Sequence, residues 1–140
     1  MKHDAVLSIC GRQSYQDQEP EKIEFVTEGT LEFRDNGWDI SYEESDLTGL
    51  AGVTTTFRVE NGKVTLKRTG KLNSQMVFQE GKSHESLYQM EFGALMMVVT
   101  SKKVAFDLTE EGGTVDLVYG IEIEQTAGGI VDYHLDVKVK

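Results

Sequence analysis

The sequence predicts an all-β fold: an antiparallel up-and-down closed barrel of about eight to ten strands. Apolar and polar residues alternate with a period of two from one end of the chain to the other, and glycine-containing turns separate the alternating runs. A β-sandwich would show the same period. Consecutive short hairpins favour the barrel, because closure removes the edges that long alternating strands would otherwise expose.

The first two predicted strands are residues 5–9 and 22–34. In the second strand, the odd positions from Ile23 to Phe33 are mostly apolar, whereas the even positions carry charges such as Glu24. Because successive side chains of a strand point to opposite faces, one face of this strand is expected in the core and the other in water.

The next strand, residues 38–42, follows a tight turn. Residues 35–37 read Asp-Asn-Gly, which tolerates the positive φ angles of a two-residue hairpin. Closing the turn there places Phe33 opposite Trp38.

A second hairpin is predicted at Asn61-Gly62, between strands 53–59 and 64–68. A two-residue loop at this point pairs Val59 with Val64 and sets the register of both strands.

The remaining alternating runs predict further strands. Their ranges are 73–79, 83–90, 94–100, 104–108, 115–123 and 131–139. Alternation stops over residues 43–50, which predict either one helical turn or a loop across a barrel mouth. No repeat or linker composition is present, so residues 1–140 are expected to form a single domain.

Composition narrows the expected partners. The chain has 24 acidic and 14 basic residues and a formal charge of −10, which predicts no nucleic-acid partner and no membrane partner. The single cysteine, Cys10, cannot form an internal disulfide and fits a reducing compartment. No apolar run is long enough for a signal peptide or a membrane span, so a cytoplasmic location is expected.

One charged side chain is predicted to point toward the apolar side of the barrel. The hairpin register that pairs Val59 with Val64 also pairs Thr55 with Arg68 on the same face. A buried arginine needs a carboxylate, a carbonyl or an anionic ligand. The alternatives are that Arg68 caps the barrel end or reaches solvent at the rim.

The inward face of residues 83–90 depends on the turn at 80–82, since a shift of one residue exchanges the two faces. A two- or four-residue loop directs Glu85 inward. A three-residue loop directs His84 and Tyr88 inward instead, which would make a polar, titratable cluster. Both registers remain open.

The sequence specifies no metal, no cofactor and no catalytic residue. His3, His84 and His134 share no ligand spacing, and no motif resembles a nucleophile elbow. The glycine-rich turns are not followed by a helix, so they favour hairpins over phosphate binding.

The stretch from Ile40 through Ala94 carries a family resemblance. Its segments read YEESDLTGL, GVTTTF, NGKVTLKRTG, MVFQEGKSHESLY and FGAL. This succession resembles the YwiB-like family of small bacterial proteins, a domain of unknown function with a calycin-like, lipocalin-type barrel. The resemblance implies a closed barrel and, by analogy, a cavity for a small molecule. It implies no catalytic or ligand-binding residues.

The leading functional hypothesis is a noncatalytic protein that binds a small, partly apolar ligand inside the barrel, and an anionic group on this ligand is one option. The residues expected to contact the ligand are Tyr42, Thr55, Arg68, Met76, Phe78, His84, Glu85 and Tyr88. One alternative is an enzyme that uses His84 or Glu85 at the mouth as acid or base. Another is a solid barrel that acts through its outer surface as a monomer or homodimer.

Overall fold

The computed structural model describes residues 2–14, 19, 21–45, 51–90, 93–123 and 126–140, and these residues contain ten strands and no helix. The strands are β1 (Lys2–Ser14), β2 (Glu21–Arg34), β3 (Gly37–Glu43), β4 (Val53–Glu60), β5 (Lys63–Gly70), β6 (Ser74–Phe78), β7 (Ser83–Met90), β8 (Gly93–Thr109), β9 (Gly112–Ile123) and β10 (Thr126–Val139). Among the residues described, no helix has the length and apolar character needed to cross a membrane.

All ten strands form one antiparallel sheet that curls into a nearly closed barrel, in the order β6-β5-β4-β3-β2-β1-β10-β9-β8-β7. The up-and-down barrel predicted from the sequence is therefore confirmed. The first and last strands pair along residues 5–14 and 130–139, which joins the two halves of the chain.

The sequence predicted a fully closed barrel, but the barrel is not closed between β6 and β7. These two strands lie at the ends of the sheet and contact each other without forming a ladder. The turn between them bonds to β8 instead. The backbone N–H of Gly81 donates to the carbonyl of Ser101, and the N–H of Ser101 donates to the carbonyl of Lys82. These bonds satisfy backbone groups of the turn and attach it to β8.

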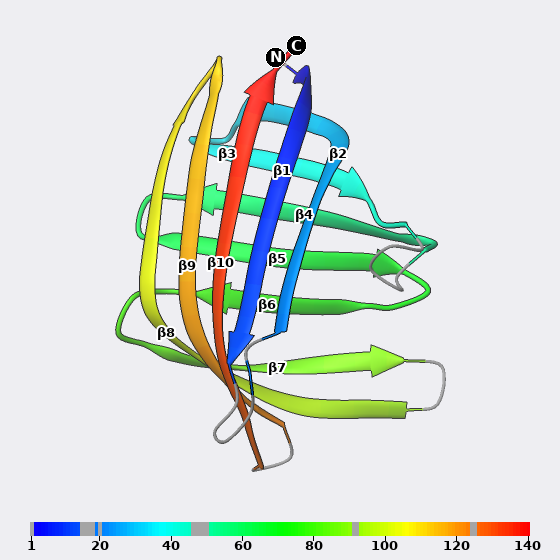
Figure 1. Cartoon of the computed structure of the whole chain (residues 1–140), viewed down its shortest axis with the longest axis vertical. Helices are drawn as coiled ribbons and strands as arrows, with labels where there is room; N and C mark the ends of the chain where they lie inside the picture. Colours follow the sequence, from blue (N-terminus) through cyan, green and yellow to red (C-terminus); the bar gives the residue numbers. More distant parts are fainter. Residues whose placement is uncertain (1, 15–18, 20, 46–50, 91–92, 124–125) are drawn as a thin grey trace.

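The barrel has two layers, seen in Figure 1 as β1, β8, β9 and β10 running lengthwise and β3 to β6 running across them. β2 belongs to both layers: residues 21–32 pair with β1 and residues 29–34 pair with β3. Gly29 lies where β2 passes from one layer to the other. A Cβ atom at this position would stand 2.3 Å from the backbone oxygen of Ser41, so the crossing requires glycine.

Both predicted hairpins have the expected registers. Phe33 pairs with Trp38, and Val59 pairs with Val64. Asp35 and Asn36 have φ angles of 49° and 61°, the left-handed conformation that this tight turn requires.

Two predicted strands, 94–100 and 104–108, are one bent strand in the structure, and this part of the prediction was wrong. β8 runs through both ranges, and its pairing with β9 shifts register between Ser101 and Lys103. Such a bulge bends the strand. Residues 93–100 of β8 pair with β7, and residues 97–109 pair with β9 on both sides of the bulge. Of the predicted helical turn or loop at 43–50, residues 46–50 lie outside the described residues.

The core lies between the two layers and is built from the alternating inward-facing residues of the strands. Phe57 and Phe78 are its largest fully buried side chains. Its other members include Leu7, Ile9, Leu31, Ile40, Val59, Val64, Val99, Val115, Leu117 and Leu135. Most of the described interior is therefore filled by side chains.

Candidate functional site

One row of inward-facing residues interrupts the apolar core. Strand registers place Tyr42 beside Thr55, Thr55 beside Arg68, and Arg68 beside Ser74, across β3 to β6. We call these four residues the polar row. The neighbouring row toward the middle of the barrel is wholly apolar, and contains Ile40, Phe57, Leu66 and Met76. Polar groups thus gather at one level inside the barrel.

Arg68 stands next to a buried carboxylate. Its Nε atom lies 3.9 Å from Oε2 of Glu44, close enough for an ion pair but too far for a hydrogen bond. The side chain of Glu44 is 1% exposed and that of Arg68 is 21% exposed. The same Glu44 oxygen accepts a hydrogen bond of 2.5 Å from the Thr55 hydroxyl.

The guanidinium of Arg68 keeps an unused donor. Its Nε–H is buried and has no hydrogen-bond acceptor among the described residues. Arg68 therefore has a counter-charge in Glu44, yet one N–H remains to be satisfied. A buried donor without an acceptor costs free energy, and such groups in native proteins call for an explanation.

Two tyrosines extend the network to the other layer of the barrel. The hydroxyl of Tyr42 is hydrogen-bonded to both Glu44 and Tyr133. Because an ionised carboxylate only accepts and a phenol has one proton, Tyr42 donates to Glu44 and Tyr133 donates to Tyr42. Burial raises the pKa of both phenols well above the usual value, and the charge of Glu44 adds to the effect at Tyr42.

A third tyrosine lies within the electrostatic influence of Arg68. Burial raises the pKa of Tyr119 to about 12, and the positive charge of Arg68 acts in the opposite direction. The ring of Tyr119 packs against Phe78 with centroids 4.6 Å apart, and the ring of Tyr133 packs against Phe57 at 5.6 Å. The charge of Arg68 therefore acts on three buried phenols, those of Tyr42, Tyr119 and Tyr133.

An open pocket of about 500 Å³ lies where β1 ends and β2 begins. We call it the mouth pocket. Its lining residues are Gly11, Arg12, Gln13, Glu21, Lys22, Ile23, Val131 and Tyr133. The register places Gly11 between Ile23 and Tyr133 on the inner face of the sheet. Tyr133 is therefore both a wall of the mouth pocket and a member of the buried hydrogen-bonded network.

Five of the predicted ligand contacts face the interior. Tyr42, Thr55, Met76 and Phe78 are all buried, and Arg68 is mostly buried. Met76 and Phe78 belong to the packed core rather than to the walls of the mouth pocket. Their predicted role as ligand contacts stays a prediction.

The strand register of β7 directs Glu85 outward. Of the two registers that the sequence left open, the structure therefore has the one that directs His84 inward, and Glu85 is not an interior residue. Glu85 is exposed, whereas the next residue, Ser86, is buried opposite Met97. His84 is on the same face as Ser86 and is half-buried, with Nε2 2.7 Å from the side-chain oxygen of Gln79. The side chain of Tyr88 lies outside the described residues.

Three residues that interact with the polar row were not predicted: Glu44, Tyr119 and Tyr133. Tyr119 and Tyr133 lie at inward positions of strongly alternating runs, so their burial could be predicted from the sequence. Their proximity to Arg68 could not be predicted, because it depends on how the two layers of the barrel cross. Glu44 follows the end of β3, where alternation stops and no face can be assigned from the sequence.

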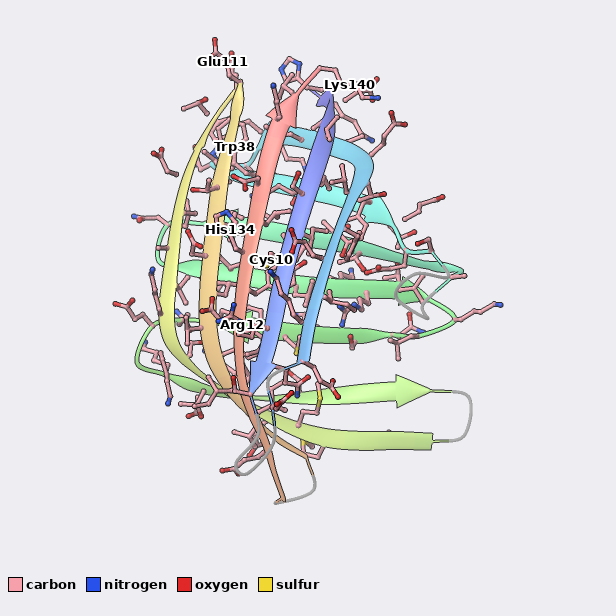
Figure 2. All side chains as sticks on the ribbon, viewed as in Figure 1. Cys10, Arg12, Trp38, Glu111, His134 and Lys140 are labelled. Carbon is pink, nitrogen blue, oxygen red and sulfur yellow. The ribbon has the colours of Figure 1, made fainter. Side chains whose placement is uncertain are left out.

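The outer face of β1 and β10 carries a separate polar cluster, visible in Figure 2 around Cys10 and His134. These two residues are directly opposite each other on the paired strands. The imidazole of His134 is hydrogen-bonded to Asp116 through Nδ1 at 2.5 Å and to Asp136 through Nε2 at 2.9 Å. Among the described residues, no group of histidines, cysteines and carboxylates has the arrangement of a metal site.

The His134 cluster predicts a pH-dependent contribution to stability. The hydrogen bond to Asp116, followed by that to Asp136, raises the pKa of His134 above its ordinary 6.5. A raised folded-state pKa gives stability that is complete below 6.5 and is lost as the pH rises through the folded value. The destabilisation caused by His134→Gln should therefore be larger at about pH 6 than at about pH 9 in urea unfolding. Because the ring is half-exposed, we expect less than about 1 kcal/mol. An equal cost at both values would contradict the assignment.

These features define the class of protein: a small, nearly closed antiparallel β-barrel with one polar level inside. The chain belongs to the family described as "Domain of unknown function (DUF1934)", which matches residues 7–137. This confirms the family resemblance carried by residues 40–94.

A protein of Bacillus subtilis, YwiB, is similar to this chain both in sequence and in structure. The chain is 30% identical over 125 residues to the "Uncharacterized beta-barrel protein YwiB" of strain 168, covering 88% of this chain and 86% of that protein. It is also similar to the crystal structure of the ywiB protein from Bacillus subtilis, with a TM-score of 0.89 and 26% sequence identity over 99% of this chain and 93% of that one.

Proposed function

We propose that this barrel is a noncatalytic binding protein that takes a small, partly apolar molecule into the mouth pocket. The observation that carries the proposal is the position of Tyr133, which forms part of the wall of this open pocket and also belongs to the buried network with Tyr42 and Glu44. A molecule in this pocket would therefore lie against a side chain that the buried network holds in place.

The walls of the mouth pocket suit a partly apolar molecule. Ile23 and Val131 present aliphatic side chains and Tyr133 presents an aromatic ring. Ile23 is 48% exposed, so a ligand seated against it would remove apolar surface from water. A few polar groups placed within an apolar pocket are typical of small-molecule sites.

Native mass spectrometry tests the proposal on protein purified from a bacterial cytosol. We expect an adduct that is present under native conditions and absent from the denatured chain. Tyr133→Phe and Arg68→Met should both reduce the fraction of protein that carries it, because Tyr133 lines the pocket and Arg68 belongs to the buried network that holds Tyr133.

Lys63→Met is the matched control, since Lys63 lies on the same strand as Arg68 but forms an exposed pair with Glu60. Its adduct should equal that of the wild type. A bare-chain mass under native conditions, or an adduct that both pocket variants retain in full, would overturn the proposal.

A further inference from the structure

We infer, on the basis of the proposed binding function, that the mouth pocket selects a molecule with a single anionic group, such as a carboxylate, on an apolar ring or short chain. The juxtaposition that points to this class is Arg12 beside an apolar wall, since both line the same pocket. The wall is formed by Ile23, Val131 and the ring of Tyr133. A guanidinium pairs with a carboxylate through two parallel hydrogen bonds, and the wall accepts the apolar part.

Arg12 is next to a carboxylate of the chain but forms no ion pair with it. The register of β1 and β10 places Arg12 directly opposite Asp132, and both residues are exposed. Among the described residues, no carboxylate lies within ion-pair distance of Arg12. Arg12 lines the mouth pocket, whereas Asp132 does not. The positive charge of Arg12 is therefore available to a molecule in the pocket.

A second cation lies opposite Arg12 on the other neighbouring strand. The register of β1 and β2 pairs Arg12 with Lys22, and both residues line the pocket. Like charges directly opposite each other are unfavourable, so an anion between them would relieve the repulsion. Lys22 forms a 3.0 Å ion pair with Glu24, but these side chains are 51% and 65% exposed. Because exposed pairs contribute little stability, a ligand can compete with Glu24 for Lys22.

One carboxylate at the rim limits the charge of the ligand. Glu21 lines the pocket and is exposed, at the position opposite Gln13. Glu24 and Asp132 lie near the rim but are not lining residues. The lining residues thus carry two cations and one carboxylate, in a chain whose formal charge is −10. One negative charge on the ligand balances this local excess, whereas a second would be repelled.

Two probes of equal shape test the inference: 4-tert-butylbenzoate and 4-tert-butylbenzamide. Isothermal titration calorimetry on the full chain at neutral pH and low salt should show the benzoate binding at least about fivefold more tightly than the benzamide. Arg12→Gln should lower the affinity for the benzoate by at least about fivefold and change that for the benzamide by less than about twofold. The reason is that this variant removes the charge and leaves the apolar wall in place.

Lys138→Gln is the matched control, because Lys138 is an exposed cation of β10 that is paired in register with Val6, outside the pocket. It removes the same charge from the chain and should change neither affinity by more than about twofold. Lys22→Gln should weaken the benzoate less than Arg12→Gln does, since Glu24 already neutralises part of the charge of Lys22.

A benzamide that binds as tightly as the benzoate would overturn the inference and leave the proposed binding function intact. An equal loss of benzoate affinity in Arg12→Gln and Lys138→Gln would also overturn it, because the effect would then come from the charge of the whole chain. If neither probe bound while native mass spectrometry still showed an adduct, the chemical class would be wrong and the binding function would stand. If neither probe bound and no adduct appeared, both proposals would fail.

Discussion

Arg68→Met should lower the free energy of unfolding by about 2–4 kcal/mol, because it leaves the carboxylate of Glu44 buried without its counter-charge. Glu44 is almost fully buried, and the hydroxyls of Thr55 and Tyr42 compensate only part of the loss. The partial exposure of Arg68 places the expected cost below that of a fully buried pair. Urea unfolding monitored by tryptophan fluorescence measures it.

A double variant separates the ion pair from simple loss of packing. Arg68→Met combined with Glu44→Gln should be more stable than Arg68→Met alone, since it removes the stranded charge. Lys63→Met provides the comparison, because Lys63 and Glu60 stand 3.8 Å apart but are about 40% exposed. It should cost less than about 1 kcal/mol. Equal costs for Arg68→Met and Lys63→Met would show that the interior pair is not buried as described.

Gly29→Ala should lower the free energy of unfolding by about 2–3 kcal/mol, because the added methyl group collides with the backbone at the layer crossing. The Cβ atom would stand 2.3 Å from the Ser41 oxygen and 2.8 Å from a methyl of Leu7. The first of these contacts is with backbone, so β2 and β3 must separate to relieve it. Their separation would also disturb Tyr42, which pairs with Gly29.

Gly11→Ala is the matched control within the same sheet. A Cβ atom there would meet only Tyr133 and Ile23, at 3.7 and 3.9 Å, which are ordinary contacts. Its stability should equal that of the wild type or exceed it slightly, because alanine loses less backbone entropy on folding than glycine. If Gly29→Ala were as stable as Gly11→Ala, the close layer crossing at β2 would be wrong.

The hairpins could be predicted from sequence because their determinants are local. The turn at Asp35 and Asn36 fixes the register of β2 and β3, and the turn at Asn61-Gly62 fixes that of β4 and β5. The inward direction of Arg68 followed from the second register alone. These are pairings between residues only a few positions apart.

Features that depend on contacts between residues far apart in the sequence were harder to predict. β8 is one strand with a bulge between Ser101 and Lys103, but the sequence predicted two strands. The prediction failed because an apolar run with a short polar interruption has the same pattern as two strands and a turn. The register of β7 could not be chosen in advance, since its turn bonds to β8 rather than to β6. The contact between Tyr133 and Tyr42 depends on how the two layers face each other.

The most direct test of the central claim compares amide spectra of ¹⁵N-labelled protein in two states: as purified from a bacterial cytosol, and after unfolding, dialysis and refolding. A small molecule bound in the mouth pocket would be removed by the second treatment. The account predicts that the largest differences between the two spectra fall on Gly11, Ile23 and Val131. Superimposable spectra, or differences centred on the outer face around Val26, would contradict it.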